Sequence, residues 1–232
     1  MSTLNVADAR DVDSSRVLPG RLDLRSSCTS VLVADPVLAG KVRAEREGSE
    51  AGDRDEVWNG VYVVSPIANN EHQFLAFELS YAFRAVIELV GGGRVFNGVN
   101  VSDRVEGWRE NFRIPDAAVV LNGGLASDCG THLRGGPDLV VEVVSPNDLT
   151  REKRPFYAGI GVRELLVVDR DPWALELYRL EEGELAPAGR SSVEEPEPLT
   201  SVVLPLMFRL VPGADRPSIE VRRTDGTQVW TI

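Results

Sequence analysis

Two apolar runs near the middle of the chain constrain its fold more than any other feature of the sequence. They read PDLVVEVVSP, over positions 137–146, and ELLVVD, over 164–169. Both are apolar at successive positions, which is typical of strands that are buried on both faces. Such strands need a layer packed on each side. We therefore predict an α/β (α+β) protein in which a central mixed β-sheet is flanked by helices.

Turn and capping signals divide the rest of the chain. Asn59-Gly60 and Asp225-Gly226 are strong hairpin turns, so we predict an N-terminal β-hairpin over 56–65 and a C-terminal β-hairpin over 218–232. Apolar spacing and capping residues predict helices over 34–48, from 69 or 70 to 89, and between 145 and 163. Further segments are predicted as strands over 94–101, 112–121, 137–145, 163–169 and 174–180, with a charged loop over 191–199.

The length of 232 residues fits one domain with short extensions. We predict a flexible N-terminal arm over 1–30, one domain over 31–212, and an extension over 213–232 that packs on the same domain as a hairpin. No apolar stretch approaches the ~18 residues of a membrane helix, and the first residues lack a secretory signal, so we expect a cytoplasmic protein with no membrane partner. The formal net charge of −11 argues against tight nonspecific DNA binding, since phosphate contacts come from basic surfaces.

Two acidic residues stand where apolar residues are expected. Asp116 follows Pro115 and precedes the run AAVVL, although aspartate is poorly suited to strands. Glu142 lies between two pairs of valines, and a carboxylate inside a buried strand is costly unless it is paired or binds a metal. An arginine partner would satisfy one such acid. Two acids on neighbouring strands, with a lysine soon after, are better explained by a divalent cation such as Mg²⁺. Without the metal, repulsion should raise the pKa of one of them.

Lys153 is the third candidate residue. Pro155 lacks an N–H and cannot sit deep inside a helix, so the helix after Ser145 must start close to Lys153. The ammonium group then lies in the first turn, just beyond the Glu142 strand, where it can orient an attacking water or offset charge on a phosphate. Without the two acids, a lysine in the run REKR would be interpreted as a solvated residue.

Several motifs occur in an order that identifies a family. FRIPDAAVV, GPDLVVEVVSP, REK and FYAGIGVRELLVVD follow one another with suitable spacing, and EVWNGVYVVSPIANNEHQ precedes them. Together they resemble the Uma-two family of restriction-endonuclease-like proteins, which belongs to the PD-(D/E)xK nuclease superfamily. The resemblance runs from about Glu56 to Leu180, with a weaker match in the tail.

The resemblance implies a restriction-endonuclease-like core and a DNA endonuclease that uses Mg²⁺ or Mn²⁺. Asp116 would be the motif aspartate and Glu142 the motif acid, with the Val143 carbonyl as a further metal ligand. The motif lysine would stand at position 144, where this chain has Val144. In this family the lysine is displaced onto the following helix, and Lys153 fits that place.

Four other residues are weaker candidates. Asp138 shares a strand face with Glu142 at ~13 Å along the strand and would support the site. His72 matches a family histidine and would lie at the rim of the site or serve the structure. Glu56 and Glu78 would add negative charge nearby.

Two functions stay open at the level of sequence. One is a metal-dependent endonuclease, and the other is a catalytically weak or inactive nuclease-fold protein that serves as a binding or regulatory module. The presence of both acids and the lysine favours the enzyme, because a fold without activity would more often lose one of them. Trp58, Tyr62 and Trp230 on the two hairpins also predict a homodimer, since aromatic residues on exposed strands are common at interfaces.

Overall fold

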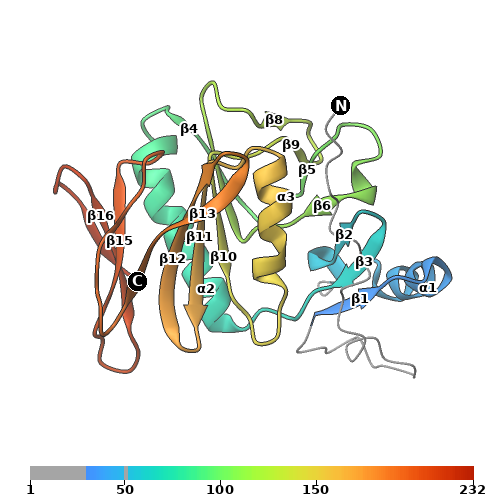
Figure 1. The fold of residues 1–232 in the computed structure, drawn as a ribbon, viewed down its shortest axis with the longest axis horizontal. Coiled ribbons are helices and arrows are strands. Elements are labelled where there is room, and N and C mark those ends of the chain that lie inside the picture. The colour runs from blue at the N-terminus through green and yellow to red at the C-terminus, as the bar shows by residue number, and fades with distance from the viewer. Residues whose placement is uncertain (1–29, 50–51) are drawn as a thin grey trace.

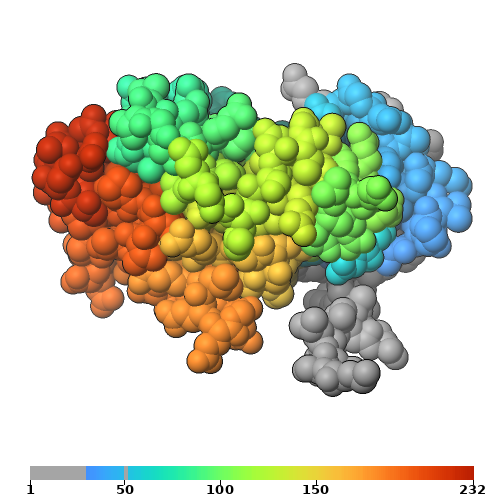
Figure 2. All heavy atoms as spheres, turned by 90° about the horizontal axis from the view of Figure 1, so that it is seen from above, coloured from blue at the N-terminus to red at the C-terminus, as the bar shows by residue number. Residues whose placement is uncertain are grey.

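The structure is a computed structural model that describes residues 30–49 and 52–232. The predicted arm over 1–30 lies outside the described residues up to position 29. Strands of the described part form three sheets, of seven, six and four strands. The sheets follow one another along the long axis, with the N-terminal sheet and the C-terminal sheet at opposite ends (Figures 1 and 2). None of the helices in the described part is long and apolar enough to cross a membrane.

The central sheet is mixed, as predicted. Its strand order is β13-β12-β11-β10-β7-β4, and only β10 and β11 run parallel to each other. The six strands are β4 (Gly93–Asn97), β7 (Ala117–Leu121), β10 (Leu139–Val143), β11 (Glu164–Arg170), β12 (Trp173–Glu181) and β13 (Glu184–Ser192). Every residue of β10 is buried, which confirms the interpretation of the run VVEVV.

The two faces of β10 pack against different layers. Leu139 and Val141 join a core with helix α2 (Asn70–Phe83) and with the C-terminal sheet. Val140 points the other way, into a core with helix α3 (Arg154–Gly159). Each fully buried Leu or Val side chain stabilises the fold by about 1.5–3 kcal/mol. Glu142 alternates with Val141 and therefore faces α3.

The N-terminal sheet is built around the predicted hairpin. Asn59 and Gly60 take positive φ values of 50° and 84°, as a two-residue hairpin turn requires. The sheet contains β1 (Val31–Val33), β2 (Glu56–Trp58), β3 (Val61–Val64), β5 (Val101–Ser102), β6 (Phe112–Arg113), β8 (Ser127–Asp128) and β9 (Leu133–Arg134). Helix α1 (Pro36–Arg46) packs on it and is capped by Asp35, whose Oδ1 accepts a hydrogen bond from the Leu38 N–H at 2.8 Å.

Two predicted strands are each divided between two sheets. The segment predicted over 94–101 contains β4 of the central sheet and β5 of the N-terminal sheet, because the chain turns at Gly98 with φ +56°. The segment predicted over 112–121 divides in the same way into β6 and β7 around Pro115, which cannot donate a ladder hydrogen bond. The two crossings touch, since the Gly98 N–H donates to the Asp116 carbonyl at 3.3 Å. Asp116 therefore stands at the junction of two sheets.

Strand β13 was missed. Its sequence contains Pro187 and Gly189, both of which are unfavourable in a strand, and no strand is predicted between 180 and 191. The register shows how they are accommodated: Leu177 pairs with Gly189 but Tyr178 pairs with Pro187, so the strand bulges between them. The charged loop predicted over 191–199 is confined to 193–198.

The C-terminal sheet contains β14 (Leu199–Thr200), β15 (Leu206–Val211), β16 (Ser218–Arg223) and β17 (Val229–Thr231). The predicted hairpin is present as β16 and β17, and β16 also pairs with β15. Glu164 of β11 attaches this sheet to the central one. Its fully buried carboxylate accepts hydrogen bonds from the Val202 N–H and the Arg179 guanidinium, each at 3.0 Å, and from the Ser201 hydroxyl.

Candidate active site

The strand register places the two anomalous acids opposite each other. β7 runs antiparallel to β10 and its last pair is Ala117 with Val141, so Asp116 and Glu142 are each the next residue beyond that pair on neighbouring strands. The Asp116 N–H donates to the Val141 carbonyl at 3.0 Å, so Asp116 is still bonded to β10 although it lies just before β7. The acids that the sequence singled out therefore meet at the end of the central sheet where the chain enters from the N-terminal sheet.

The Asp116 carboxylate is held by two partners. Oδ2 accepts a hydrogen bond from the Val143 N–H at 2.7 Å, and Oδ1 lies 2.8 Å from Nε2 of His72. The other ring nitrogen of His72 lies 3.2 Å from the Ser145 hydroxyl, and His72 itself stands in the first turn of α2, capped by Asn69. His72 is thus a direct partner of Asp116, in a buried position.

Glu142 is bound by residues of the following helix. Nζ of Lys153 lies 3.1 and 3.0 Å from its two carboxylate oxygens, and the Tyr157 hydroxyl donates to Oε1 at 2.5 Å. Lys153 is the last residue of a 3₁₀ turn, Thr150–Lys153, that runs directly into α3. The helix therefore starts where Pro155 required, and Tyr157 follows Lys153 by one helical turn on the same face. An arginine partner was the alternative for Glu142, and the structure gives lysine and tyrosine instead.

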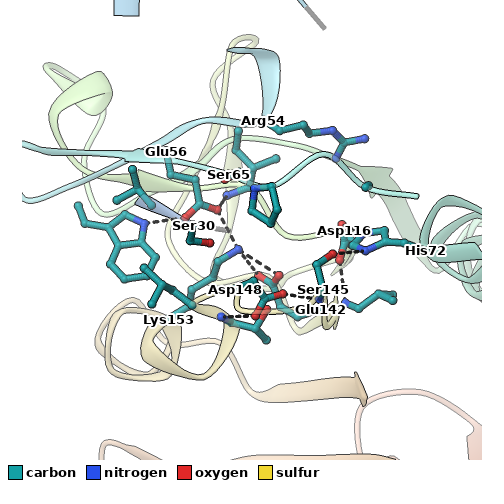
Figure 3. A pocket seen from close by; sticks show the side chains of 18 residues that line it. Ser30, Arg54, Glu56, Ser65, His72, Asp116, Glu142, Ser145, Asp148 and Lys153 are labelled. Carbon is teal, nitrogen blue, oxygen red and sulfur yellow. Dashed lines mark hydrogen bonds and ion pairs between the residues drawn. The ribbon is translucent and has the colours of Figure 1, made fainter. Parts of the chain in front are cut away.

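Glu56 is the second anion on Lys153. Its Oε1 lies 2.9 Å from Nζ and accepts the Ile114 N–H at 2.8 Å, while Oε2 accepts the Trp58 indole N–H at 2.6 Å. Figure 3 shows the lysine reaching between Glu56 and Glu142, with Asp116 and His72 farther along the same cavity. Glu56 comes from the N-terminal sheet and Glu142 from the central sheet, so the lysine ties the two sheets together.

The burial of these groups sets their protonation. Burial raises the pKa of Glu142 to about 8; the Lys153 ammonium opposes this, and the charges of Asp116 and Glu56 add to it. Burial acts in the same direction on Asp116, but the hydrogen bond and charge of His72 and the Val143 N–H bring its pKa below the ordinary value. The predicted raised pKa is therefore found on Glu142, with burial as the larger cause and repulsion as a smaller one. Burial alone would lower the pKa of Lys153, yet its carboxylate neighbours raise it, so the ammonium persists at neutral pH.

All of these groups line one cavity of about 60 Å³, enough for a few waters. The three predicted supporting residues do not all lie at the cavity. Glu56 and His72 line the cavity, whereas Asp138 does not: its carboxylate accepts the Leu121 N–H at 2.8 Å and pairs with Arg163 at 3.0 Å, at the start of β10. Glu78 also lies outside the cavity lining.

Sequence reasoning missed Tyr157, Ser145, Asp148 and Arg54, which contact the acids or line the cavity. Tyr157 could have been found from its four-residue spacing from Lys153 on a helix. Asp148 accepts the N–H groups of Ser145 and Thr150 at 2.5 and 3.0 Å, so it organises the loop between β10 and the 3₁₀ turn. Its signal was the sequence SPND, typical of a turn.

Asp116 and Glu142 are the carboxylates that could hold a divalent cation in the cavity. Within residues 30–49 and 52–232, no group of three or more His, Cys, Asp or Glu side chains is arranged to hold a metal ion. Mg²⁺ commonly uses one or two carboxylates and keeps several waters, and Asp116 and Glu142 meet that smaller requirement. The Glu142 oxygens that such an ion would use are those that Lys153 and Tyr157 contact.

The mixed sheet, with Asp116 and Glu142 on neighbouring strands and Lys153 just before the next helix, fits the restriction-endonuclease-like class that the sequence predicts. The chain belongs to the Uma2 family, described as "Putative restriction endonuclease", whose family model matches residues 43–211. A solved structure described as "a putative nuclease belonging to DUF820 from Anabaena variabilis ATCC 29413" is similar in fold, with a TM-score of 0.50 and 17% sequence identity over 64% of this chain and 80% of that chain. No curated protein sequence matches the chain.

Proposed function

We propose that this protein is a divalent-metal-dependent endonuclease that hydrolyses DNA phosphodiester bonds, with Mg²⁺ or Mn²⁺ as the cofactor. One observation carries the proposal: Asp116 and Glu142 line the same cavity from opposed strands, and Nζ of Lys153 lies 3.0 Å from Glu142. Membership of the Uma2 family supports the nuclease class. The Val143 carbonyl stays a predicted ligand, at the strand position between the acid and the helix.

Each residue has a distinct part in this reaction. A divalent cation held by Asp116 and Glu142 would supply an activated water and offset charge on the phosphate. His72 and the Val143 N–H fix the orientation of the Asp116 carboxylate. Lys153 remains protonated at neutral pH, so it acts as a cation that orients water or a phosphate oxygen and does not serve as a base.

The second candidate function is a nuclease-fold module that binds and regulates without cleaving. One observation favours it: Glu142 is engaged by Lys153 and Tyr157 and has a pKa of about 8, so its metal-free form holds a proton near neutral pH. A cation would have to displace both the proton and the lysine. The charge of −11 points the same way.

A cleavage assay separates the two functions. Plasmid, linear duplex, single-stranded and branched DNA are incubated with wild-type protein and with Mg²⁺ or Mn²⁺, beside Glu142→Gln and Glu78→Gln. The control removes the same charge from a position outside the cavity. Cleavage by wild type and Glu78→Gln, with none by Glu142→Gln, supports the enzyme. Equal residual cleavage by all three would indicate a contaminant and remove the support for the site.

Three further points belong to this proposal. We infer a cytoplasmic protein whose macromolecular partner is DNA. The homodimer stays a prediction, but the aromatic residues of the two hairpins give it less support than the sequence suggests. Tyr62 is buried, Trp58 binds Glu56 and Trp230 packs against the core. Light scattering at high protein concentration tests it, and a monomer would refute it.

A further inference from the structure

One cation at the cavity has no anionic partner in the part of the chain that the structure describes. Three basic side chains line the cavity, namely Arg54, His72 and Lys153. Lys153 is paired with two glutamates and His72 with Asp116. Among the residues that the structure describes, the Arg54 side chain forms no hydrogen bond and no ion pair. Arg54 is partly exposed and lines the same cavity as a group of carboxylates, so its guanidinium is available to an external anion.

The backbone beside Arg54 leaves room for its guanidinium. A Cβ atom added at Gly98 would lie 2.7 Å from Nη1 and 3.1 Å from Cζ of Arg54. Gly98 is the point where the chain leaves the central sheet, and its N–H is bonded to the Asp116 carbonyl. Figure 3 shows Arg54 extending toward the side of the cavity that holds Asp116 and His72. The arginine is thus seated on the same backbone junction that positions the aspartate.

A larger hollow opens next to the cavity. It has a volume of about 640 Å³, within the range of about 300–1,000 Å³ that is common for small-molecule sites. Arg54, Pro66 and Ala68 line both the hollow and the cavity, so the two are continuous. Gln73 and Asn97 add amide groups to the hollow.

The chemistry of the hollow fits a nucleobase better than a phosphate group. Ile67, 56% exposed, offers an apolar surface for a base face, and the Gln73 amide can both donate to and accept from a base edge. Asn97 can accept through its Oδ1, since its Nδ2 already donates to the Ser80 hydroxyl at 2.7 Å. Asp53 lies there too and would repel a phosphate. In a duplex the Watson–Crick edges are already paired, so these amides suit an unpaired base.

We propose that Arg54 binds a phosphate adjacent to the bond to be cleaved, and that the neighbouring hollow holds an unpaired base of the same strand. The substrate class is therefore single-stranded DNA or a single-stranded region. This inference rests on the proposed function, and it adds a binding residue and a substrate form to it. Arg54 supplies the charge that the paired lysine and histidine cannot offer.

Binding of a fluorescent single-stranded oligonucleotide, followed by anisotropy in EDTA across a salt series, tests the inference without any cleavage. Arg54→Gln should weaken binding about tenfold and reduce the slope of log K against log salt by about 0.7, the value for one lost contact on a single strand. Arg134→Gln removes the same charge from an exposed strand residue outside both hollows and should change neither quantity. Arg54→Lys should recover part of the slope.

A glycine pair gives an independent arm. Gly98→Ala should weaken binding in the same direction as Arg54→Gln, because the new methyl group displaces the guanidinium. Gly91→Ala is the matched control, since Gly91 also has a positive φ, +75°, but nothing lies within 4 Å of an added Cβ. Melting temperatures of both variants show that the fold is retained.

The binding measurements distinguish support for this inference from its refutation. Selective loss in Arg54→Gln and Gly98→Ala, together with tighter binding of single strands than of blunt duplex, supports the inference. Equal effects of Arg54→Gln and Arg134→Gln, a preference for duplex, or no binding by wild type would overturn it. A metal-dependent rise in the melting temperature of wild type reports on the metal site separately, so the proposed function can survive when this inference fails.

Discussion

The buried carboxyl of Glu142 leads to a prediction about how stability depends on pH. Its pKa is about 8 in the folded protein, against an ordinary value of 4.5. Between these two values the folded state holds a proton that the unfolded state has released. A group with a raised folded pKa stabilises the fold fully below the unfolded pKa, and that stability is lost as pH rises through the folded pKa. The metal-free protein should therefore become less stable from about pH 4.5 to about pH 8.

The magnitude follows from one proton. Each pH unit within the window should lower the free energy of unfolding by about 1.4 kcal/mol, and the whole window by about 5 kcal/mol. Asp116 does not contribute here, because its pKa lies below 3.8 and it stays ionised throughout the window. Glu142→Gln removes the titrating group but keeps its size and neutrality. Relative to wild type, this variant should thus gain about 1.4 kcal/mol per pH unit.

Urea unfolding of both proteins in EDTA at pH 5, 6, 7 and 8 measures this difference directly. Subtracting one curve from the other cancels the pH dependence of the carboxyls and histidines that do not interact with Glu142. A difference that is flat across the series would refute the reasoning, since it would mean that Glu142 is ionised in the folded protein throughout. Added Mg²⁺ should reduce the slope in wild type, because the cation binds the ionised carboxylate.

Three further perturbations follow from the same contacts. Lys153→Ala should abolish cleavage but keep most of the metal-induced stabilisation of roughly 2–3 kcal/mol at a hundredfold excess over Kd, because lysine is no ligand; thermal melts with and without Mn²⁺ check this, and loss of the metal response would contradict it. Tyr157→Phe should cost about 1–2 kcal/mol by leaving Glu142 short of a donor, and more at pH 8 than at pH 5, as measured by urea unfolding. Glu164→Gln should cost about 1–3 kcal/mol and increase amide exchange in β15 and β16, because it weakens the attachment of the C-terminal sheet; unchanged exchange there would count against that role.

The sequence revealed the site where burial and charge conflict. Glu142 stood out because a carboxylate between four valines is costly, and Asp116 because it begins an apolar strand. Both interpretations depend on local sequence alone, and the pairing of β7 with β10 then brings the two residues to the same end of neighbouring strands. Lys153 followed from Pro155, which limits where a helix can begin.

The parts that could not be predicted depend on contacts between distant segments. No local signal links Glu56 to Lys153, because their ion pair exists only after the N-terminal and central sheets pack together. The strand crossings at Gly98 and Pro115 look like continuous strands, since the apolar pattern does not change when a chain passes to another sheet. No local sequence pattern marks Arg54 as a site residue, because what distinguishes it is that its side chain has no partner among the described residues.

The ion pair between Glu56 and Lys153 has a consequence for folding kinetics. Its two residues are 97 positions apart (153 − 56), and contacts of such long sequence separation form slowly, because loop closure must precede them. The chain can form the central sheet around β10 and β11 earlier, from neighbouring segments. Glu142 and Lys153 are only 11 positions apart and can meet with the central sheet, whereas Glu56 reaches the lysine only when the N-terminal sheet docks. A partly folded chain would accordingly lack the second anion on Lys153, so the full set of contacts at the site would exist only once the N-terminal sheet has docked.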